Sequence, residues 1–432
     1  MSASYLILDD SFVTDGDILI KSKNYIDFIK KTDEPIALVL GRYITSDLGA
    51  VRNLDRKNIP TIVLSPYVKQ ISSFSRYYKG ITCPHPKYDE KKYVDFLLDI
   101  GKNLNNKGVL LPNGDAEVLI TLKNKSNLEK YYEFSSADFG IVEKLVNKRI
   151  FYETINKHGI LCPKTYFLND ESDIKKTCKK ISYPCIVKPV HSDYFVSDFR
   201  TKLFVAKSEV DLMKKYKIAT AKKHKVMIQE IIPGEVKNHY GFNAYYDRNL
   251  KLNGSFMYRR IREWPHDFGN GCLIESVKIP ELEKIVTDLV KKIGYYGIVD
   301  AEFKKDSRDN KFKLLEINPR CWMQNSLPAR CGINYSYMAY MDAIGKNFEK
   351  QEFNGKHVKW LFMLEDLQSS LKSMLKGDLS FQEWVNSFKG EKEYTIFAWD
   401  DPIPFFVLFS KSVYLALPYL LKWASPYSYG KI

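Results

Sequence analysis

Short apolar runs alternate with amphipathic segments over the first quarter of the chain. Apolar runs rich in Val, Ile and Leu occupy residues 34–41, 59–66 and 108–115, and helical patterns cover 47–58 and 90–104 between them. Apolar strands that are separated by helices are typical of a parallel sheet. No G-x-G-x-x-G follows any of these runs, so the pattern favours a Rossmann-like sheet without a dinucleotide-binding turn.

The pattern changes after this region. One long helical pattern covers 139–159, and an apolar run at 183–189 (YPCIVKP) predicts a buried strand. Alternating polar and apolar residues over 237–261 predict an antiparallel hairpin that turns at Asp247–Asn249. A further helical pattern closes at Gly294 and leads into two strands that are joined by a charged turn. After residue 350 the chain is helical and then aromatic.

The two strands that follow Gly294 carry acidic side chains in the stretches VDAEF and LLEIN. Side chains alternate along a strand, so Asp300 shares a face with Glu302, and Glu316 shares a face with Asn318. An antiparallel pairing of the two strands brings Glu302 to Glu316. Carboxylate and amide oxygens are suitable ligands for Mg²⁺, and substrate phosphates typically complete the coordination of this ion. The alternative is an ordinary hairpin whose acidic residues face solvent.

Three basic residues are candidates for contacts with phosphate. One follows the acidic strands directly, and the other two occur earlier in the chain. Arg320 follows LLEIN and is able to neutralise phosphate charge. Lys188 ends the strand at 183–189, where it is either a surface residue with an extended stem or a point charge for phosphate. Lys148 lies forty residues earlier, inside a helical pattern.

The stretch QEIIPGE runs from a strand into a linker and a turn. A flat base held between two domains needs main-chain donors and acceptors, which the linker at Glu230 and Ile232 offers. Glu235 follows Gly234 at the turn and is placed to accept hydrogen bonds from ribose hydroxyls.

Composition and charge narrow the class of protein. The 432 residues are 45% hydrophobic and 27% charged, which is ordinary for a globular protein, and the net charge is +14. Such a charge suits nucleic acid, anionic lipid or phosphorylated substrates. The densest basic run, 214–225, has the pattern of a solvated helix face, and no nucleic-acid-binding motif accompanies it.

Cysteine usage and the first residues bear on location. The seven cysteines form no C-x-x-C pair, and their number is odd, which favours a reducing cytoplasm over a disulfide framework or a zinc site. The first residues, MSASYLILDD, do not have the pattern of a signal peptide.

Residues 403–424 are apolar for about the length of a membrane span, with Lys411 and Pro418 as interruptions. We expect a helix that packs on the protein. A helix at the membrane surface and a true span are the alternatives.

The order of Lys148, VKP, QEIIPGE, DAEF and LLEINPR resembles the ATP-grasp superfamily of carboxylate–amine ligases. The matching core covers about residues 139–335, and the first part of the chain is similar to the domain that precedes the ATP-grasp fold. The segment YRRIREWPHDFGNGCLIES (258–276), with GRYITSDLGAVRNL and FAWDDPIPFF, looks like the group that includes D-aspartate ligases and cell-surface polysaccharide ligases.

The resemblance implies a role for each matching residue. Lys148 and Lys188 would contact the phosphates of ATP, Glu230 and Ile232 would present main-chain groups to adenine, and Glu235 would bind ribose. One or two Mg²⁺ ions, with Mn²⁺ as an alternative, would be held by Glu302, Glu316 and Asn318. Arg262 and Arg320 would stabilise the transferring phosphoryl group, and Arg260 is a weaker match for the same work.

One departure from the superfamily concerns the loop after Lys188. Residues 189–200 contain no glycine, so the backbone cannot wrap phosphates as closely as a glycine-rich loop does. His191, Ser192, Arg200 and Lys202 would substitute for it, or the loop would form a looser lid.

The implied fold class is α/β, with an α+β catalytic part. We expect a Rossmann-like domain over 1–125, an ATP-grasp domain over 126–345 and a C-terminal helical and aromatic extension over 346–432. The small lobe would span about 160–235 and the large lobe, with the magnesium site, 236–345.

The implied activity is amide formation through an acyl phosphate. The substrates would be an amino acid or other amine and a carboxylate, with a nucleotide- or lipid-linked sugar precursor of the cell envelope as acceptor. A cytoplasmic location, with 403–424 touching the inner face of the membrane, goes with this expectation. A ligase for a small peptide or metabolite and a non-catalytic nucleotide-binding scaffold are the alternatives. A nucleic-acid-binding protein is a third class.

Overall fold

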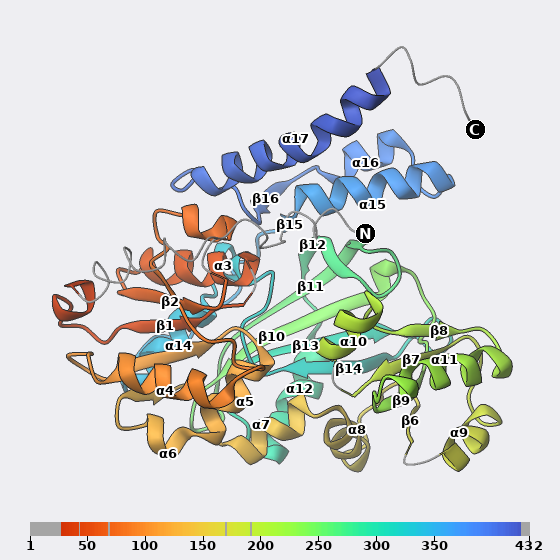
Figure 1. The fold of residues 1–432 in the computed structure, drawn as a ribbon, viewed down its shortest axis with the longest axis horizontal. Helices are drawn as coiled ribbons and strands as arrows, with labels where there is room; N and C mark the ends of the chain where they lie inside the picture. The colour runs from red at the N-terminus through yellow and green to blue at the C-terminus, as the bar shows by residue number, and fades with distance from the viewer. Residues whose placement is uncertain (1–26, 43, 68–69, 169–170, 191, 425–432) are drawn as a thin grey trace.

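A computed structural model of the chain describes residues 27–424, except 43, 68–69, 169–170 and 191. The first ten residues and His191, on which two expectations rest, lie outside the described residues. The described residues form three sheets, and helices pack against them (Figure 1). The seven cysteines are all described, and none forms a disulfide.

The first sheet is parallel and has the order β3-β2-β1-β4-β5 within the described chain. The predicted strands β1, β2 and β4 are confirmed. The edge strands β3 and β5 were not predicted, because each has three residues and no long apolar run. The strands are β1 (Ala37–Leu40), β2 (Thr61–Ser65), β3 (Gly80–Thr82), β4 (Gly108–Pro112) and β5 (Tyr132–Phe134), and the helices are α3 (Ile44–Asp55), η2 (Ile71–Phe74), α4 (Glu90–Gly101), α5 (Asp115–Lys123) and α6 (Lys125–Leu128).

The second sheet is antiparallel, with the order β6-β9-β7-β8 among described residues. The predicted strand at 183–189 is confirmed as β7. Helix α10 occupies most of the glycine-free stretch that was expected to be a loop, and its Phe195 packs against Phe199 and Phe204. The elements are β6 (Thr165–Phe167), α9 (Glu171–Cys178), β7 (Cys185–Pro189), α10 (Ser192–Phe199), β8 (Phe204–Ala206), α11 (Glu209–Ala221) and β9 (Val226–Glu230).

The third sheet has the order β14-β13-β10-β11-β12-β15-β16 in the described chain. Strands β10 and β11 form the predicted hairpin, and α12 closes at Gly294, which has a φ of 72°. Strands β15 and β16 were not predicted, and the predicted domain boundary at 345 remains a prediction. The elements are η3 (Val236–Asn238), β10 (His239–Tyr246), β11 (Leu252–Trp264), β12 (Asn270–Val277), α12 (Pro280–Ile293), β13 (Gly297–Lys305), β14 (Phe312–Asn318), α13 (Ser326–Arg330), α14 (Tyr335–Ala343), β15 (Val358–Leu361) and β16 (Glu391–Tyr394).

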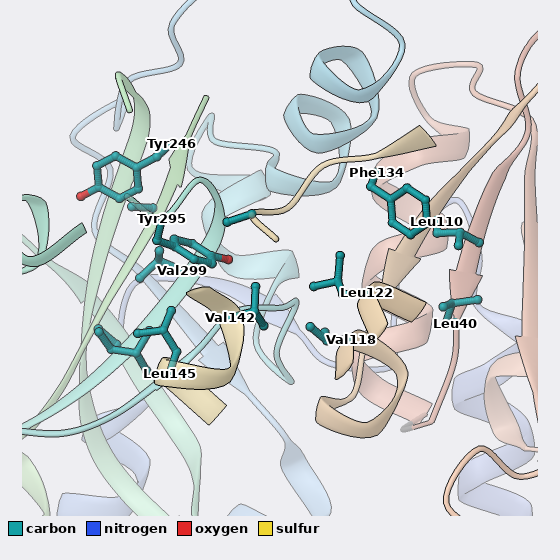
Figure 2. Packing of buried hydrophobic residues seen from close by; sticks show 14 of the residues in the cluster. Leu40, Leu110, Val118, Leu122, Phe134, Val142, Leu145, Tyr246, Tyr295 and Val299 are labelled. Carbon is teal, nitrogen blue, oxygen red and sulfur yellow. The ribbon is translucent and has the colours of Figure 1, made fainter. Parts of the chain in front are cut away.

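One apolar cluster joins the first sheet to the third. Figure 2 shows Val142 of α7 (Phe139–Val146) between Leu110 of the parallel sheet and Val299 of β13, with Leu145 below Val299 in the view. All four side chains are buried. This shared core fixes the first sheet against the third, so loops from both are held in a defined relationship.

The long helix predicted over 139–159 is two helices, α7 (Phe139–Val146) and α8 (Lys148–Lys157). Asn147 separates them, and its side chain accepts hydrogen bonds from the N–H groups of Arg149 and Ile150 at 3.1 and 3.4 Å. This cap begins a new helix at Lys148. The sequence pattern missed the break because apolar spacing continues through it.

Three helices from the last part of the described chain, α15 (Met363–Lys376), α16 (Phe381–Ser387) and α17 (Ile403–Ala424), gather at one end of the molecule (Figure 1). A search of the described helices finds none with both the length and the apolar character to cross a membrane.

Candidate active site

The polar face of the third sheet is built by register. Glu316 lies opposite Glu302, Glu302 lies opposite Gly241, and Gly241 lies opposite Tyr258, so the four positions form one row across four strands. Residues paired in this way point to the same side of a sheet. The predicted meeting of Glu302 and Glu316 is therefore confirmed by the pairing of β13 with β14.

A second row on the same face contains Asn318, Asp300 and Asn243. The carboxylate of Asp300 accepts from Asn243 Nδ2 at 2.8 Å and from Asn318 Nδ2 at 3.0 Å. Burial, and then the charge of Glu302, raise the pKa of Asp300 to about 7. Because Asn318 gives its amide N–H to Asp300, its Oδ1 is left to face Arg320, whose Nη2 lies 3.3 Å away.

Positive charges surround Glu316. Lys188 at the end of β7 places its Nζ 3.9 Å from Glu316 Oε2. This ion pair connects the second sheet to the third. Burial alone would favour the neutral carboxyl, but the charges of Lys188, Lys148, Lys202 and Arg320 outweigh it and lower the pKa of Glu316. Glu316 is thus an ionised acid among cations, which is an arrangement suited to an anionic ligand and a metal ion.

The structure separates the two predicted arginines of β11. Arg260 Nη2 donates to Glu302 Oε2 at 2.5 Å, on the acidic face of the sheet. Arg262 is buried, and its Nε donates to Asp366 Oδ1 of α15 at 2.6 Å. A bulge at Ile261 causes the difference, because Arg260 pairs with Ile274 while Arg262 pairs with Leu273, on the opposite face. The structure does not bring Arg262 to the acids, and the weaker match, Arg260, is there instead.

Arg320 connects the site to the first part of the chain. Its Nε donates to Asp115 Oδ1 of α5 at 2.6 Å, and its Nη1 donates to the carbonyl of Cys321 at 3.1 Å. One guanidinium therefore contacts both the predicted ligand Asn318 and the first turn of α5.

The linker after β9 is held by a residue that the sequence did not indicate. Arg308, in the turn between β13 and β14, pairs with the Glu230 carboxylate at 2.6 Å. The main-chain N–H of Glu230 donates to the carbonyl of Lys164 at 2.9 Å, within the sheet. A base at this linker would have to use other main-chain atoms. Ile232 is buried and Glu235 is exposed.

A second cation from the small sheet's loops also reaches the third sheet. Lys202 Nζ donates to Asn270 Oδ1 at 3.0 Å. The pKa of Lys202 is lowered by desolvation, while the carboxylates of Glu302 and Glu316 act in the opposite direction. Of the residues named as substitutes for a glycine-rich loop, Lys202 is therefore in electrostatic range of the acids.

The donor set at Glu302, Glu316 and Asn318 fits a hard cation, because it offers two carboxylates and an amide oxygen. Among the described residues, no group of three His, Cys, Asp or Glu side chains is arranged to hold a metal by itself. The third donor here is an amide, and Glu302 is turned to Arg260. The positive charge of Arg260 neutralises the carboxylate that a metal ion would otherwise neutralise.

Comparisons with known proteins agree with this architecture, although no protein-family model matches the chain. Biotin carboxylase from Campylobacter jejuni superposes with a TM-score of 0.59 and 16% identity, covering 74% of each chain. N5-carboxyaminoimidazole synthetase from Staphylococcus aureus, solved with ADP, superposes with a TM-score of 0.58 and 16% identity over 76% of this chain and 81% of the other. The fold is the ATP-grasp fold.

Curated relatives narrow the class. The chain is 24% identical to D-aspartate ligase of Enterococcus faecium (strain Aus0004) over 274 residues, which is 60% of this chain and 65% of that one. It is 26% identical to a formate-dependent phosphoribosylglycinamide formyltransferase of Methanocella arvoryzae over 43% of this chain and 45% of that one. The chain thus spans less than two thirds of these relatives. The chain is thus similar in sequence to these two enzymes, and it has the fold of the solved structures named above.

Proposed function

We propose that the protein is an ATP-dependent ligase that joins a carboxylate to an amine and releases ADP and phosphate. The observation that carries the proposal is the row of Glu316 and Glu302, with Lys188 facing it from the second sheet and Arg260 paired to it within the third. Two acids inside a ring of cations are a poor structural core but a suitable cradle for a metal nucleotide.

The chemistry balances in two steps. A carboxylate oxygen attacks the γ-phosphorus, and the bond to the leaving ADP oxygen breaks, which gives an acyl phosphate. The amine nitrogen then attacks the acyl carbon, the C–O bond to phosphate breaks, and the nitrogen loses a proton to solvent. The protein contributes mainly position and charge neutralisation.

Each part of the site has a role in this proposal. Lys148 and Lys188 bind phosphate oxygens, Arg260 and Arg320 hold the transferring group, and Glu302, Glu316 and Asn318 would hold one or two Mg²⁺ or Mn²⁺ ions. The ion, when bound, supplies positive charge against the phosphate oxygens. The linker at Ile232 contacts adenine, and Glu235 accepts from ribose. Arg262 is assigned to packing against Asp366.

The substrate class follows from likeness and charge. Similarity to a D-aspartate ligase supports an amino acid as one substrate. A net charge of +14 supports an anionic acceptor, such as a nucleotide- or lipid-linked precursor of the cell envelope. A cytoplasmic site of action, with contact between 403–424 and the inner face of the membrane, belongs to the same proposal. A ligase for a small peptide or metabolite is the second candidate.

The test is ADP release by the purified chain with MgATP, across single amino acids and nucleotide-linked sugar precursors. We expect release that requires both an amino acid and a sugar precursor, and that stops with EDTA. Release from two free amino acids would favour the peptide ligase. Glu316→Gln should lower kcat by about 10²–10³ without changing the unfolding midpoint in urea. Glu349→Gln is the matched control. Full activity in Glu316→Gln, or no response to any amino acid, would contradict the proposal.

A further inference from the structure

Helix α15 is amphipathic, but its polar side faces the protein and its apolar side faces solvent. Its buried face is polar and is formed by Glu365, Asp366, Ser369 and Ser370. Its outer face is apolar, with Met363, Leu367, Leu371 and Leu375 at intervals of four residues, so they form one stripe. Leu375 is 89% exposed and Leu371 is 51% exposed. A helix on the surface of a globular protein normally has the opposite arrangement, because burial of apolar surface stabilises the fold.

Neighbouring elements continue this exposed apolar surface. Phe381 and Val385 of α16 are exposed, as is Trp399, at 91%. On α17, Ile403, Phe406, Phe409 and Val413 are exposed on one side of the helix, while Leu408 is buried. Together with the α15 stripe we call these residues the C-terminal apolar surface. Figure 1 shows the three helices at the same end of the molecule. Exposed apolar residues that gather at one end of a molecule in this way are typical of an interaction site.

The charged residues of α15 and α17 favour an anionic partner. The acids of α15, Glu365 and Asp366, are buried, and Asp366 is paired with Arg262. The outer charges of α15 are Lys372 and Lys376. Helix α17 contains no Asp or Glu, and its charged positions are Lys411 and Lys422. Helix α15 therefore combines an apolar stripe with exposed lysines, and α17 combines an apolar stripe with a sequence whose charged residues are all lysine. An exposed Trp lies just before α17.

We infer that the C-terminal apolar surface, including the reversed face of α15, rests on the headgroup region of an anionic lipid bilayer. Apolar stripes with lysine and aromatic residues are the features by which helices lie at a bilayer surface. The described helices are not suited to crossing the bilayer, so the contact is peripheral. The inference extends the contact beyond 403–424 to a helix whose sequence gave no such indication, and it does not depend on the ligase activity.

The experiment is flotation of the full chain with vesicles of phosphatidylcholine, alone or with phosphatidylglycerol. We expect the wild-type chain to float with the anionic vesicles and not with the neutral ones, and to bind less as salt rises. The double variant Leu371→Asp/Leu375→Asp should bind at least about tenfold more weakly, because two leucines no longer enter the apolar layer.

Val210→Asp is the matched control, since Val210 is 80% exposed on α11, in the second sheet's layer of the molecule. It should bind vesicles like the wild-type chain. Circular dichroism of all variants checks that they fold. Equal flotation with neutral vesicles would overturn the anionic assignment. Absence of flotation would overturn the inference, as would a dimer in sedimentation equilibrium that the double variant converts to a monomer, because a second copy would then cover the surface.

Discussion

Arg260 and Glu302 pair across a strand that lies between them, with Nη2 of the arginine 2.5 Å from Oε2 of the acid. Arg260 is on β11, Glu302 is on β13, and β10 separates the two strands. The ion pair fixes the position of one carboxylate of the candidate metal site. Two residues further along β11, Arg262 serves a different purpose, because the bulge at Ile261 turns it toward Asp366.

The two arginines should therefore respond differently to removal. Arg260→Ala should lower kcat for ADP release by about 10²–10³, since a cation that the proposed mechanism places against the transferring phosphoryl group is lost. Arg262→Ala should leave kcat within a few-fold but lower the free energy of unfolding by about 3–5 kcal/mol, because Asp366 stays buried without its partner. Urea unfolding and steady-state kinetics of both variants check this. The reverse outcome would return the catalytic role to Arg262.

Gly241 sits under the ring of Tyr258 in the same row as the two acids. A Cβ at Gly241 would lie 2.0 Å from Tyr258 Cε1, and Tyr258 is buried and has little room to move. Gly241→Ala should therefore lower both stability, by about 1–3 kcal/mol, and activity. Gly140→Ala is the control, because its added Cβ would meet no atom within 4 Å other than its chain neighbours and the backbone of its own helix, and in helix α7 it should stabilise by about 0.5–1 kcal/mol. Equal effects of the two substitutions would contradict the close packing at Gly241.

Asp47 should make the stability of the protein depend on pH. Burial raises the pKa of Asp47 from 3.8 to about 7, although Asn113 Nδ2 donates to it at 2.9 Å. The folded state therefore keeps a proton that the unfolded state has lost between pH 4 and 7. Stability contributed by this proton is present below about pH 4 and is lost as pH rises through 7. Asp47→Asn should flatten this decline in urea unfolding, and Asp99→Asn, on exposed helix surface, should not.

The cap between α7 and α8 should matter for both stability and nucleotide binding. Asn147→Ala removes the acceptor of two main-chain N–H groups and should cost about 1 kcal/mol of unfolding free energy. Because Lys148 begins α8, the same change should raise KM for ATP. Asn147→Asp keeps the acceptor and should preserve both values. An unchanged KM in Asn147→Ala would speak against Lys148 as a phosphate ligand.

The local sequence pattern was sufficient to predict features that depend on one element or on two neighbouring elements. Apolar runs predicted β1, β2, β4 and β7, because a strand buried on both faces needs apolar residues throughout. Alternation in VDAEF and LLEIN, with the charged turn between them, placed Glu302 opposite Glu316. The likeness of the ordered motifs to ATP-grasp proteins agrees with the fold of the described chain.

The sequence pattern could not predict contacts between segments that are distant along the chain. Strands β3, β5, β15 and β16 have only three or four residues each, and β15 pairs with β12 through Leu361 and Leu273, which are far apart in sequence. The bulge that separates Arg260 from Arg262 adds one residue to a strand, which leaves no mark in composition. Arg308 reaches Glu230 only because the turn between β13 and β14 folds against the linker.

The sequence by itself thus determined the longer apolar strands and the identity of the acidic pair, since both follow from spacing along one or two neighbouring elements. Only the tertiary structure decided which arginine joins that pair, which cation faces it from the second sheet, and which face of α15 is outward. The physical reason is that these outcomes depend on register and on packing between segments that lie tens to hundreds of residues apart.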